Sequence, residues 1–444
     1  MRTFLALLVS LLFPVWLPAR AQNPGVIAID NVNVVPMTRE EVLPRQRVLI
    51  VDGKILKIEP ASAPLAYPVS QRIDGTDKYL LPGLVEMHYH WRSNDIQSDF
   101  KLLLANGVTT VRNMADAGGQ HLGIRHQTQT GELPRLNYFT TGPYLQGKDL
   151  DSPEKICQVV QAHKEKGYDF LKLADNLPQN LYLTLLAEAQ ARQLPVVGHA
   201  QRQLPLEYSL RMKSIEHIEE FVYLSDDAGQ PLVKQSRAEL NQVAQQVKAS
   251  GAYVGTTLVV FDFINRCLDD EKFRALQQSP LAKYLARQQR EDFLTERNDY
   301  RKLRTRTFGG VQALTFFQSQ ATWIQGFAHT LARNQVPLLI GSDTYGMVIV
   351  GFSLHQEFEL LQKAGLKPYD ILQAGTVNAA RYLNTYPTEG TVTEGKNANL
   401  LLLSKNPLTD VRNTKSIEGV LLHGQWLGRA RLDQMLREVE AAYR

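Results

Sequence analysis

The sequence predicts an α/β fold in which a (β/α)8 barrel of the TIM type carries a small β-sandwich built from both ends of the chain. Three observations support this prediction. Strand-like and helix-like segments alternate between about residues 81 and 385, β-rich segments flank this region on both sides, and polar residues follow several of the strands. A chain of 444 residues, 44% hydrophobic and 21% charged, is long enough for one barrel with a satellite domain.

Residues 1–21 have the features of a secretory signal peptide. Arg2 gives a positive start, an apolar run extends from Phe4 to Leu17, and small residues precede an expected cleavage before Gln22. The run is shorter than the roughly 20 apolar residues that a bilayer crossing needs, and no later stretch is apolar enough to span a membrane. We therefore expect an exported protein, periplasmic or secreted, without a membrane span.

The two flanking segments, 22–80 and 386–444, share a β-rich texture. The first contains "VIAIDNVNVV" and "RVLIVDGKILKIEP", where Val and Ile recur at every second position around a turn at Asp52-Gly53. The second contains "NANLLLLSKNP" and "SIEGVLLHGQWLG", followed by a terminal helix. The similar patterns at the two ends predict that they combine into one β-sandwich.

The region 81–385 holds eight candidate strands, separated for the most part by amphipathic or helix-rich stretches. In chain order they are "LVEMHYH", "GVTTVRN", "RLNYFTTGP", "DFLKLAD", "PVVGHA", "SIEHI", "AYVGTTLVV" and "VPLLIGSD". An open doubly wound sheet would usually carry a Gly-rich phosphate loop after its first strand, and this sequence has none there. The charged, helix-prone stretch at about 260–335 is expected to be an insertion, either a lid beside the barrel mouth or a pair of outer helices.

The composition argues against several classes of function. The 49 basic residues nearly balance the 45 acidic ones, which gives no support for nucleic-acid binding or for a polybasic membrane surface. Only two cysteines are present, Cys157 and Cys267, and two isolated cysteines do not define a disulfide scaffold, although they could pair in an oxidising compartment.

Residues able to bind a metal ion stand at the ends of several predicted strands. His88 and His90 end the first strand, where residues two apart point to the same face. His199, His217 and Asp343 end the fifth, sixth and eighth. The C-terminal ends of barrel strands meet at one face, where barrel enzymes keep their active sites. Imidazole nitrogens and carboxylate oxygens are the ligands that zinc and similar ions use, so we expect a metal site there.

Lys172 adds a second indication of chemistry. It lies between Leu171 and Leu173 on the fourth strand, so its side chain points to the opposite face from theirs, which we take to be the barrel interior. An unpaired buried ammonium is costly. A carboxylate partner is one resolution, and reaction with CO₂ to give an anionic carbamate is another. Taken alone, each of these residues favours a structural role, but their joint placement at strand ends favours a site.

The chain resembles the amidohydrolase superfamily of metal-dependent hydrolases, in its prolidase-like and imidazolonepropionase-like branch. The resemblance covers nearly all of the chain after residue 21, and its most specific part is the order His-x-His, Lys, His, His, Asp. "LPGLVEMHYH", "GVTTVRN", "SIEHIEE" and "LLIGSD" carry it. Two positions depart from the family pattern, because Glu86 stands where Asp is usual before the first His, and Asn113 stands where Asp is usual after Arg112.

This resemblance implies a centre of two divalent metal ions, with zinc expected. His88, His90 and Asp343 would hold the more buried ion, and His199 and His217 would hold the second. Lys172, carboxylated on its side-chain nitrogen, would bridge the two ions. A hydroxide between the ions would be the nucleophile, the second ion would polarise the scissile carbonyl, and Asp343 would be the catalytic residue that moves the proton to the leaving group.

The resemblance also implies a reaction class. We expect hydrolysis of a C–N amide bond in a small-molecule substrate, with a dipeptide or N-acyl amino acid as the first choice. Hydrolysis of cyclic amides, lactones or other esters uses the same kind of site, and a catalytically silent binding protein is the alternative outside enzymes. Deamination ranks lower, because deaminase sites of this superfamily usually hold one metal and lack the lysine. The state of assembly stays open, with a homo-oligomer as one possibility.

Four residues near the predicted metal ligands are candidates for contact with substrate. Tyr89 lies between the paired histidines, Tyr144 follows the third strand, and Glu220 and Tyr223 follow the sixth. A tyrosine could hold a substrate carboxylate, and a glutamate could hold a free amine.

Overall fold

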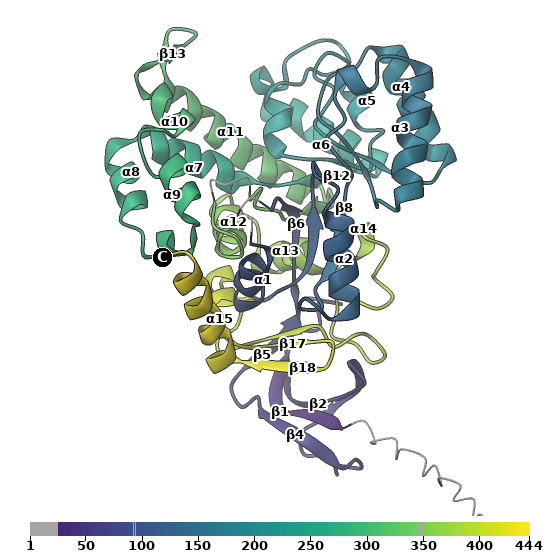
Figure 1. Cartoon of the computed structure of the whole chain (residues 1–444), viewed down its shortest axis with the longest axis vertical. Helices are drawn as coiled ribbons and strands as arrows, with labels where there is room; N and C mark the ends of the chain where they lie inside the picture. Colours follow the sequence, from purple (N-terminus) through teal and green to yellow (C-terminus); the bar gives the residue numbers. More distant parts are fainter. Residues whose placement is uncertain (1–24, 92, 94, 345–347) are drawn as a thin grey trace, which may run out of the picture.

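A computed structural model describes residues 25–91, 93, 95–344 and 348–444, so the expected signal peptide lies outside the described residues. The two ends of the chain come together in one eight-stranded sheet at the bottom of Figure 1. The path through this sheet is β18-β17-β16-β5-β1-β2-β3, with β4 paired to β1. The N-terminal part supplies β1 (Val26–Val34), β2 (Leu43–Val51), β3 (Lys54–Pro60), β4 (Val69–Asp74) and β5 (Tyr79–Pro82). The C-terminal part supplies β16 (Leu400–Leu403), β17 (Ile417–Leu422) and β18 (Gln425–Gly428).

The alternating pattern of these end segments explains their pairing. Val and Leu residues at every second position, such as Leu80, Leu400 and Leu402, face one cluster of buried side chains. The antiparallel pair β5–β16 joins the two ends directly, with Leu80 opposite Leu402. The prediction that both ends combine is therefore correct, and among the described residues they combine in a single sheet.

Eight parallel strands form the middle of the molecule in two sheets. The first sheet contains β6 (Leu84–Tyr89), β7 (Val108–Asn113) and β8 (Asn137–Thr140). The second contains β9 (Leu171–Leu173), β10 (Val196–Gly198), β11 (Ser214–Ile215), β12 (Tyr253–Gly255) and β15 (Leu338–Leu339). Each of the eight segments predicted from the sequence contains one of these strands, and neighbours in space follow chain order.

Hydrogen bonds join the two sheets on both sides. Between β8 and β9, the backbone N–H of Leu145 donates to the carbonyl of Lys172 at 2.8 Å. Between β15 and β6, the N–H of Met87 donates to the carbonyl of Ile340 at 3.0 Å. The carboxyl ends of the first and last parallel strands therefore lie next to each other.

Helices connect most of these strands and surround them. They are α1 (Ile96–Ala105), α2 (His121–Thr130), α3 (Pro153–Lys166), α4 (Gln179–Ala191), α5 (Leu206–Ser209), α6 (Arg237–Ser250), α12 (Phe352–Lys363), α13 (Pro368–Gln373), α14 (Ala379–Tyr382) and α15 (Arg429–Ala442). The terminal helix α15 packs on α1 (Figure 1). Among the described residues, the helices include none that is both long and apolar enough to cross a membrane.

The stretch at 260–335 is mostly helical. It contains most of α7 (Leu258–Leu268), then α8 (Asp270–Gln277), α9 (Arg287–Phe293), α10 (Asp299–Lys302) and α11 (Ala313–Arg333), with a short hairpin of β13 (Thr307–Phe308) and β14 (Val311–Gln312). These helices stand together at the upper left of Figure 1. One segment differs from prediction, because "AYVGTTLVV" is a strand only as far as Gly255 and its last three residues begin α7.

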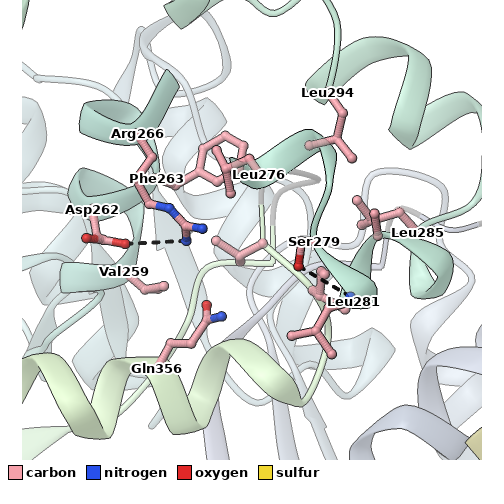
Figure 2. A pocket seen from close by; sticks show the side chains of 13 residues that line it. Val259, Asp262, Phe263, Arg266, Leu276, Ser279, Leu281, Leu285, Leu294 and Gln356 are labelled. Carbon is pink, nitrogen blue, oxygen red and sulfur yellow. Dashed lines mark hydrogen bonds and ion pairs between the residues drawn. The ribbon is translucent and has the colours of Figure 1, made fainter. Parts of the chain in front are cut away.

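A pocket lies inside this helical stretch, between α7, α8 and the start of α12 (Figure 2). Most of its lining is apolar, and it includes an ion pair of Asp262 with Arg266 at 3.7 Å. None of the predicted metal ligands lines it. Cys267, on α7, is a buried free thiol, and Cys157 on α3 is also free.

Candidate metal centre

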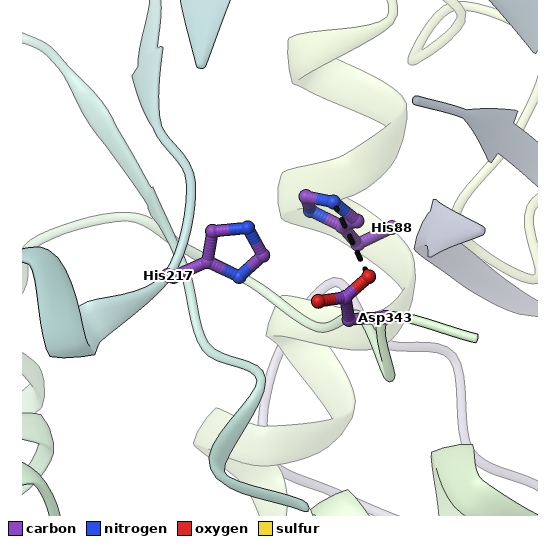
Figure 3. A group of neighbouring side chains, drawn as sticks. All are labelled: His88, His217 and Asp343. Carbon is purple, nitrogen blue, oxygen red and sulfur yellow. Dashed lines mark ion pairs between the residues drawn. The ribbon is translucent and has the colours of Figure 1, made fainter. Parts of the chain in front are cut away.

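Three of the predicted ligands meet at the carboxyl ends of the parallel strands. His88 lies at the end of β6, His217 follows β11, and Asp343 follows β15. One candidate ligand atom from each residue lies within 4.8 Å of the other two, and Figure 3 shows the three side chains facing a common space. Strands far apart in sequence thus bring two imidazoles and a carboxylate together.

The other predicted ligands adjoin this group. His90 Nε2 lies 3.2 Å from Asp343 Oδ1, and the ring of His199 is centred 5.1 Å from that of His217. Lys172 Nζ lies 3.4 Å from His88 Nε2. All six residues expected from the sequence therefore gather in one place, although their roles as ligands stay a prediction.

Buried carboxylates contact the Nδ1 atoms of two of the histidines. His88 Nδ1 lies 3.1 Å from Glu216 Oε2, and His199 Nδ1 lies 2.7 Å from Glu220 Oε1. An ionised carboxylate only accepts hydrogen bonds, so Nδ1 carries the hydrogen in each ring. In the neutral imidazole, Nε2 then has the lone pair that a metal ion requires.

His217 reaches the same tautomer through a hydroxyl. Its Nδ1 lies 2.9 Å from Thr257 Oγ1, and that hydroxyl donates to Glu219 Oε2 at 3.4 Å. Because the hydroxyl hydrogen goes to Glu219, the oxygen accepts from Nδ1–H of His217. In His88, His199 and His217, Nδ1 is therefore bound to a neighbour and Nε2 is the atom that can bind a metal ion. A different neighbour orients each ring.

The charge state of the buried groups suits cation binding. Burial lowers the pKa of His88 to about 3, so the ring is neutral at neutral pH. Burial opposes ionisation of Asp343, but interactions with His88 and His90 outweigh it and hold its pKa well below the ordinary range. Two neutral donors and a carboxylate are a donor set that divalent ions such as zinc accept.

Lys172 is fully buried at this site. Only 1% of the residue is exposed, and burial lowers its pKa to about 8. A substantial fraction of its amine is therefore neutral near pH 8, which is the form that reacts with CO₂. The residue fits the carbamate that the sequence resemblance implies.

Glu216 is a residue that sequence reasoning missed. Besides contacting His88, it accepts hydrogen bonds from Arg112 at 2.8 Å and from Ser214 at 2.6 Å. Arg112 also donates to Tyr382 at 2.9 Å. A glutamate next to a predicted ligand in the apolar run "SIEHI" was the available signal, because a buried charge there needs partners.

Glu86 connects the two strands that carry the first and last ligands. Its carboxylate accepts from the backbone N–H groups of His88 at 3.0 Å and Ser342 at 2.9 Å, and from the Ser342 hydroxyl at 2.5 Å. Burial raises its pKa to about 7. Glutamate at this position thus fixes the backbone of the first histidine against the segment that leads into Asp343.

Three residues at this site have unusual backbone angles. His217, Thr257 and Asp343 have φ angles of 75°, 52° and 49°, in the left-handed region that residues with a Cβ rarely adopt. Such strain costs of order 1–3 kcal/mol per residue and is typical of functional sites. The fold holds these three side chains in place at an energetic cost.

The four candidate substrate contacts have different surroundings. Tyr144 Oη lies 3.4 Å from His90 Nδ1, so it reaches the site, and Tyr223 is 42% exposed. Tyr89 is fully buried and donates to Asp99 on α1 at 2.5 Å. Glu220 is bound to His199 and to Arg202. Tyr144 therefore adjoins the site and Tyr223 is exposed, whereas Tyr89 and Glu220 have partners within the protein; contact of these residues with substrate stays a prediction.

Comparison with known proteins agrees with this picture. Residues 79–427 match the model of the Amidohydrolase family. Over 131 residues the chain is 25% identical to adenine deaminase of Paracoccus denitrificans (strain Pd 1222), a match that takes in 28% of this chain and only 22% of the deaminase.

Solved structures share the fold at low sequence identity. The bottromycin amidohydrolase AH superposes with a TM-score of 0.72 at 22% identity, over 94% of this chain and 90% of that one. A Xaa-Pro dipeptidase with bound methionine in its active site gives 0.66 at 16% identity, over 91% of this chain and 100% of that one. The family match spans most of the chain, from β5 to β18, and the chain belongs to the amidohydrolase family.

Proposed function

We propose that this protein is a hydrolase with two divalent metal ions, which cleaves a C–N amide bond in a small substrate. The observation that carries the proposal is the set of three histidines whose Nδ1 atoms are held by Glu216, Glu220 and Thr257. Nε2 of His88 lies 3.8 Å from Asp343 Oδ1, and its ring adjoins those of His90 and His217. A histidine with only a structural role has no need for such surroundings. The eight parallel strands, joined on both sides by hydrogen bonds, support a closed (β/α)8 barrel around this centre.

Six residues would hold the two ions. His88, His90 and Asp343 would bind one ion, and His199 and His217 would bind the other. Lys172, carboxylated after its neutral amine adds CO₂, would contact both. The nearness of Lys172 Nζ to His88 Nε2, at 3.4 Å, supports this assignment. Zinc is the metal we propose, because imidazole and carboxylate ligands suit it.

When bound, the metal ions would supply a water molecule of lowered pKa and polarise the scissile carbonyl. The protein's own groups orient the reactants and move the proton. Asp343 stays ionised at neutral pH, so it can accept the proton of the attacking water and give it to the leaving amine. Tyr144, whose hydroxyl lies 3.4 Å from His90 Nδ1, would donate a hydrogen bond to the substrate.

The substrate we favour is a dipeptide or N-acyl amino acid. A Xaa-Pro dipeptidase and an amidohydrolase are among the proteins that share the fold. Because a shared fold does not determine the substrate, the alternatives remain cyclic amides, lactones or other esters, and a protein that only binds its ligand.

A substrate panel tests the proposal. The metal-loaded protein is incubated with dipeptides, N-acyl amino acids, lactones and cyclic amides, with Asp343→Asn as the matched control. We expect turnover of at least one dipeptide or acyl amino acid by the wild type and its loss in the variant. Turnover restricted to lactones would replace the substrate class, and binding without any turnover would support the silent binding protein.

Export is a separate part of the proposal. Residues 1–21 would direct secretion and be removed, leaving Gln22 as the first residue. Sequencing the N-terminus of the protein recovered from the cell exterior or periplasm tests this, and a cytoplasmic protein that keeps Met1 would contradict it.

A further inference from the structure

Arg202 comes three residues after His199, a predicted ligand of the candidate centre. The two side chains are linked through Glu220, since Oε1 of this carboxylate lies 2.7 Å from His199 Nδ1 and 2.6 Å from Arg202 Nη2. Glu220 is almost fully buried, whereas the side chains of His199 and Arg202 are 32% and 40% exposed. The guanidinium therefore lies beside a predicted metal ligand and is open to solvent.

The orientation of this guanidinium is fixed on two sides. One edge makes a paired contact with Glu220, in which Nε donates to Oε2 at 2.8 Å and Nη2 donates to Oε1 at 2.6 Å. One face covers the ring of Tyr223, whose centroid lies 4.2 Å from Cζ. For Nη1, no hydrogen-bond or ion-pair partner is found in the part of the chain that the structure describes.

A guanidinium held in this way is suited to a carboxylate. Arginine presents its N–H groups as a planar fork that matches the two oxygens of a carboxylate, and a preorganised fork loses little entropy on binding. A free lysine or a flexible arginine at the same place would lack that advantage. The Nη1 group of Arg202 is left for a ligand, on a side chain that is 40% exposed next to the 32% exposed side chain of His199.

We propose that Arg202 binds the free carboxylate of the substrate, so that the substrate is an N-acyl amino acid or dipeptide carrying its carboxylate on the His199 side of the centre. This inference rests on the proposed amide hydrolysis and adds the chemical group that the site selects. Tyr223 stiffens the guanidinium through its ring, which gives this candidate substrate residue a supporting role.

A matched pair of compounds tests the proposal: N-acetyl-L-alanine, and N-acetyl-L-alaninamide, which lacks the charge. Acetate release by the metal-loaded full chain is measured for both. We expect the wild type to favour the acid, and Arg202→Gln to reduce that preference about 10- to 100-fold, mainly through KM, because a hydrogen bond to a charged group is lost. Arg211→Gln is the control, since Arg211 also covers a tyrosine ring, with Cζ 4.9 Å from the Tyr208 centroid, but belongs to no part of the centre.

The outcomes separate the two proposals. If Arg202 acts only by positioning His199 through Glu220, its replacement lowers turnover of both compounds equally, and the ratio stays unchanged, which overturns the inference. If neither compound is hydrolysed but other amides are, the ratio is measured on those amides and their uncharged analogues. If no amide is hydrolysed, the proposed function fails, and calorimetric binding of the same acid and amide to the metal-loaded protein decides the role of Arg202. Tighter binding of the acid by the wild type than by Arg202→Gln supports the inference, and equal binding or none contradicts it.

Discussion

Replacing Thr257 with valine removes one hydroxyl and keeps the size and branching of the side chain. That hydroxyl accepts the hydrogen of His217 Nδ1 at 2.9 Å, in a residue that is fully buried. The variant leaves a buried N–H without an acceptor, which costs about 1–3 kcal/mol of stability. Without this acceptor, the ring of His217 is no longer held in one tautomer and one orientation. Loss of such a partner typically lowers metal affinity by about 10- to 100-fold.

Two measurements separate these effects. Metal affinity is obtained by competition with a chelator, and stability by urea unfolding of the metal-free protein. Thr257→Ser is the control, because it keeps the hydroxyl and loses only a methyl group, so its affinity should stay near that of the wild type. An affinity of Thr257→Val equal to that of Thr257→Ser would refute the reasoning that the hydroxyl orients His217.

Three further predictions concern Lys172, His355 and Gly341. Lys172→Ala should lose most activity, with partial rescue by added short-chain carboxylic acids that replace the bridge, and full activity without rescue would refute a bridged centre. His355 is fully buried, and burial lowers its pKa to about 4. In the unfolded chain this histidine takes up a proton as the pH falls through about 6.5, whereas in the folded protein it stays neutral until the pH approaches 4. The folded protein therefore loses stability as the pH falls. Urea unfolding at pH 7 and pH 5 should show that His355→Gln loses about 2 kcal/mol less stability on acidification than the wild type, and an equal loss in both proteins would contradict this reasoning. Gly341→Ala should lower both the melting temperature and metal affinity, because the new Cβ would lie 2.7 Å from the backbone nitrogen of His88, and overpacking of this kind costs about 1–3 kcal/mol. An unchanged melting temperature in Gly341→Ala would contradict this reasoning, because it would show that the segment at Gly341 can move away from His88 without loss of stability.

The sequence predicts the ligand positions because strand geometry is local. Side chains two apart share a face, and parallel strands bring their carboxyl ends together, so His88 and His217 can be assigned to one place without coordinates. The partners of those histidines depend on contacts across the fold. Glu216 is 128 positions from His88, and Thr257 is 40 positions from His217. No local pattern indicates such pairs.

Contacts across the fold also decide two details that the local pattern leaves open. The apolar run from Leu258 to Val260 is typical of a strand and of a buried helix alike. In the structure it forms the first turn of α7, because it packs within the helical stretch. The carboxylate of Glu220 binds Arg202, a contact that no local pattern indicates, and the expected contact of Glu220 with substrate stays a prediction. The domain boundaries at about residues 80 and 385 stay a prediction, with β5 continuing in the end sheet to Pro82.

The central claim is that these strand ends hold two metal ions, and elemental analysis tests it most directly. Full-length protein supplemented with zinc and bicarbonate, then freed of unbound metal, should contain about two ions per chain, and His217→Ala should contain fewer. Absence of metal from the supplemented wild type, or the full content in the histidine variant, would contradict the account.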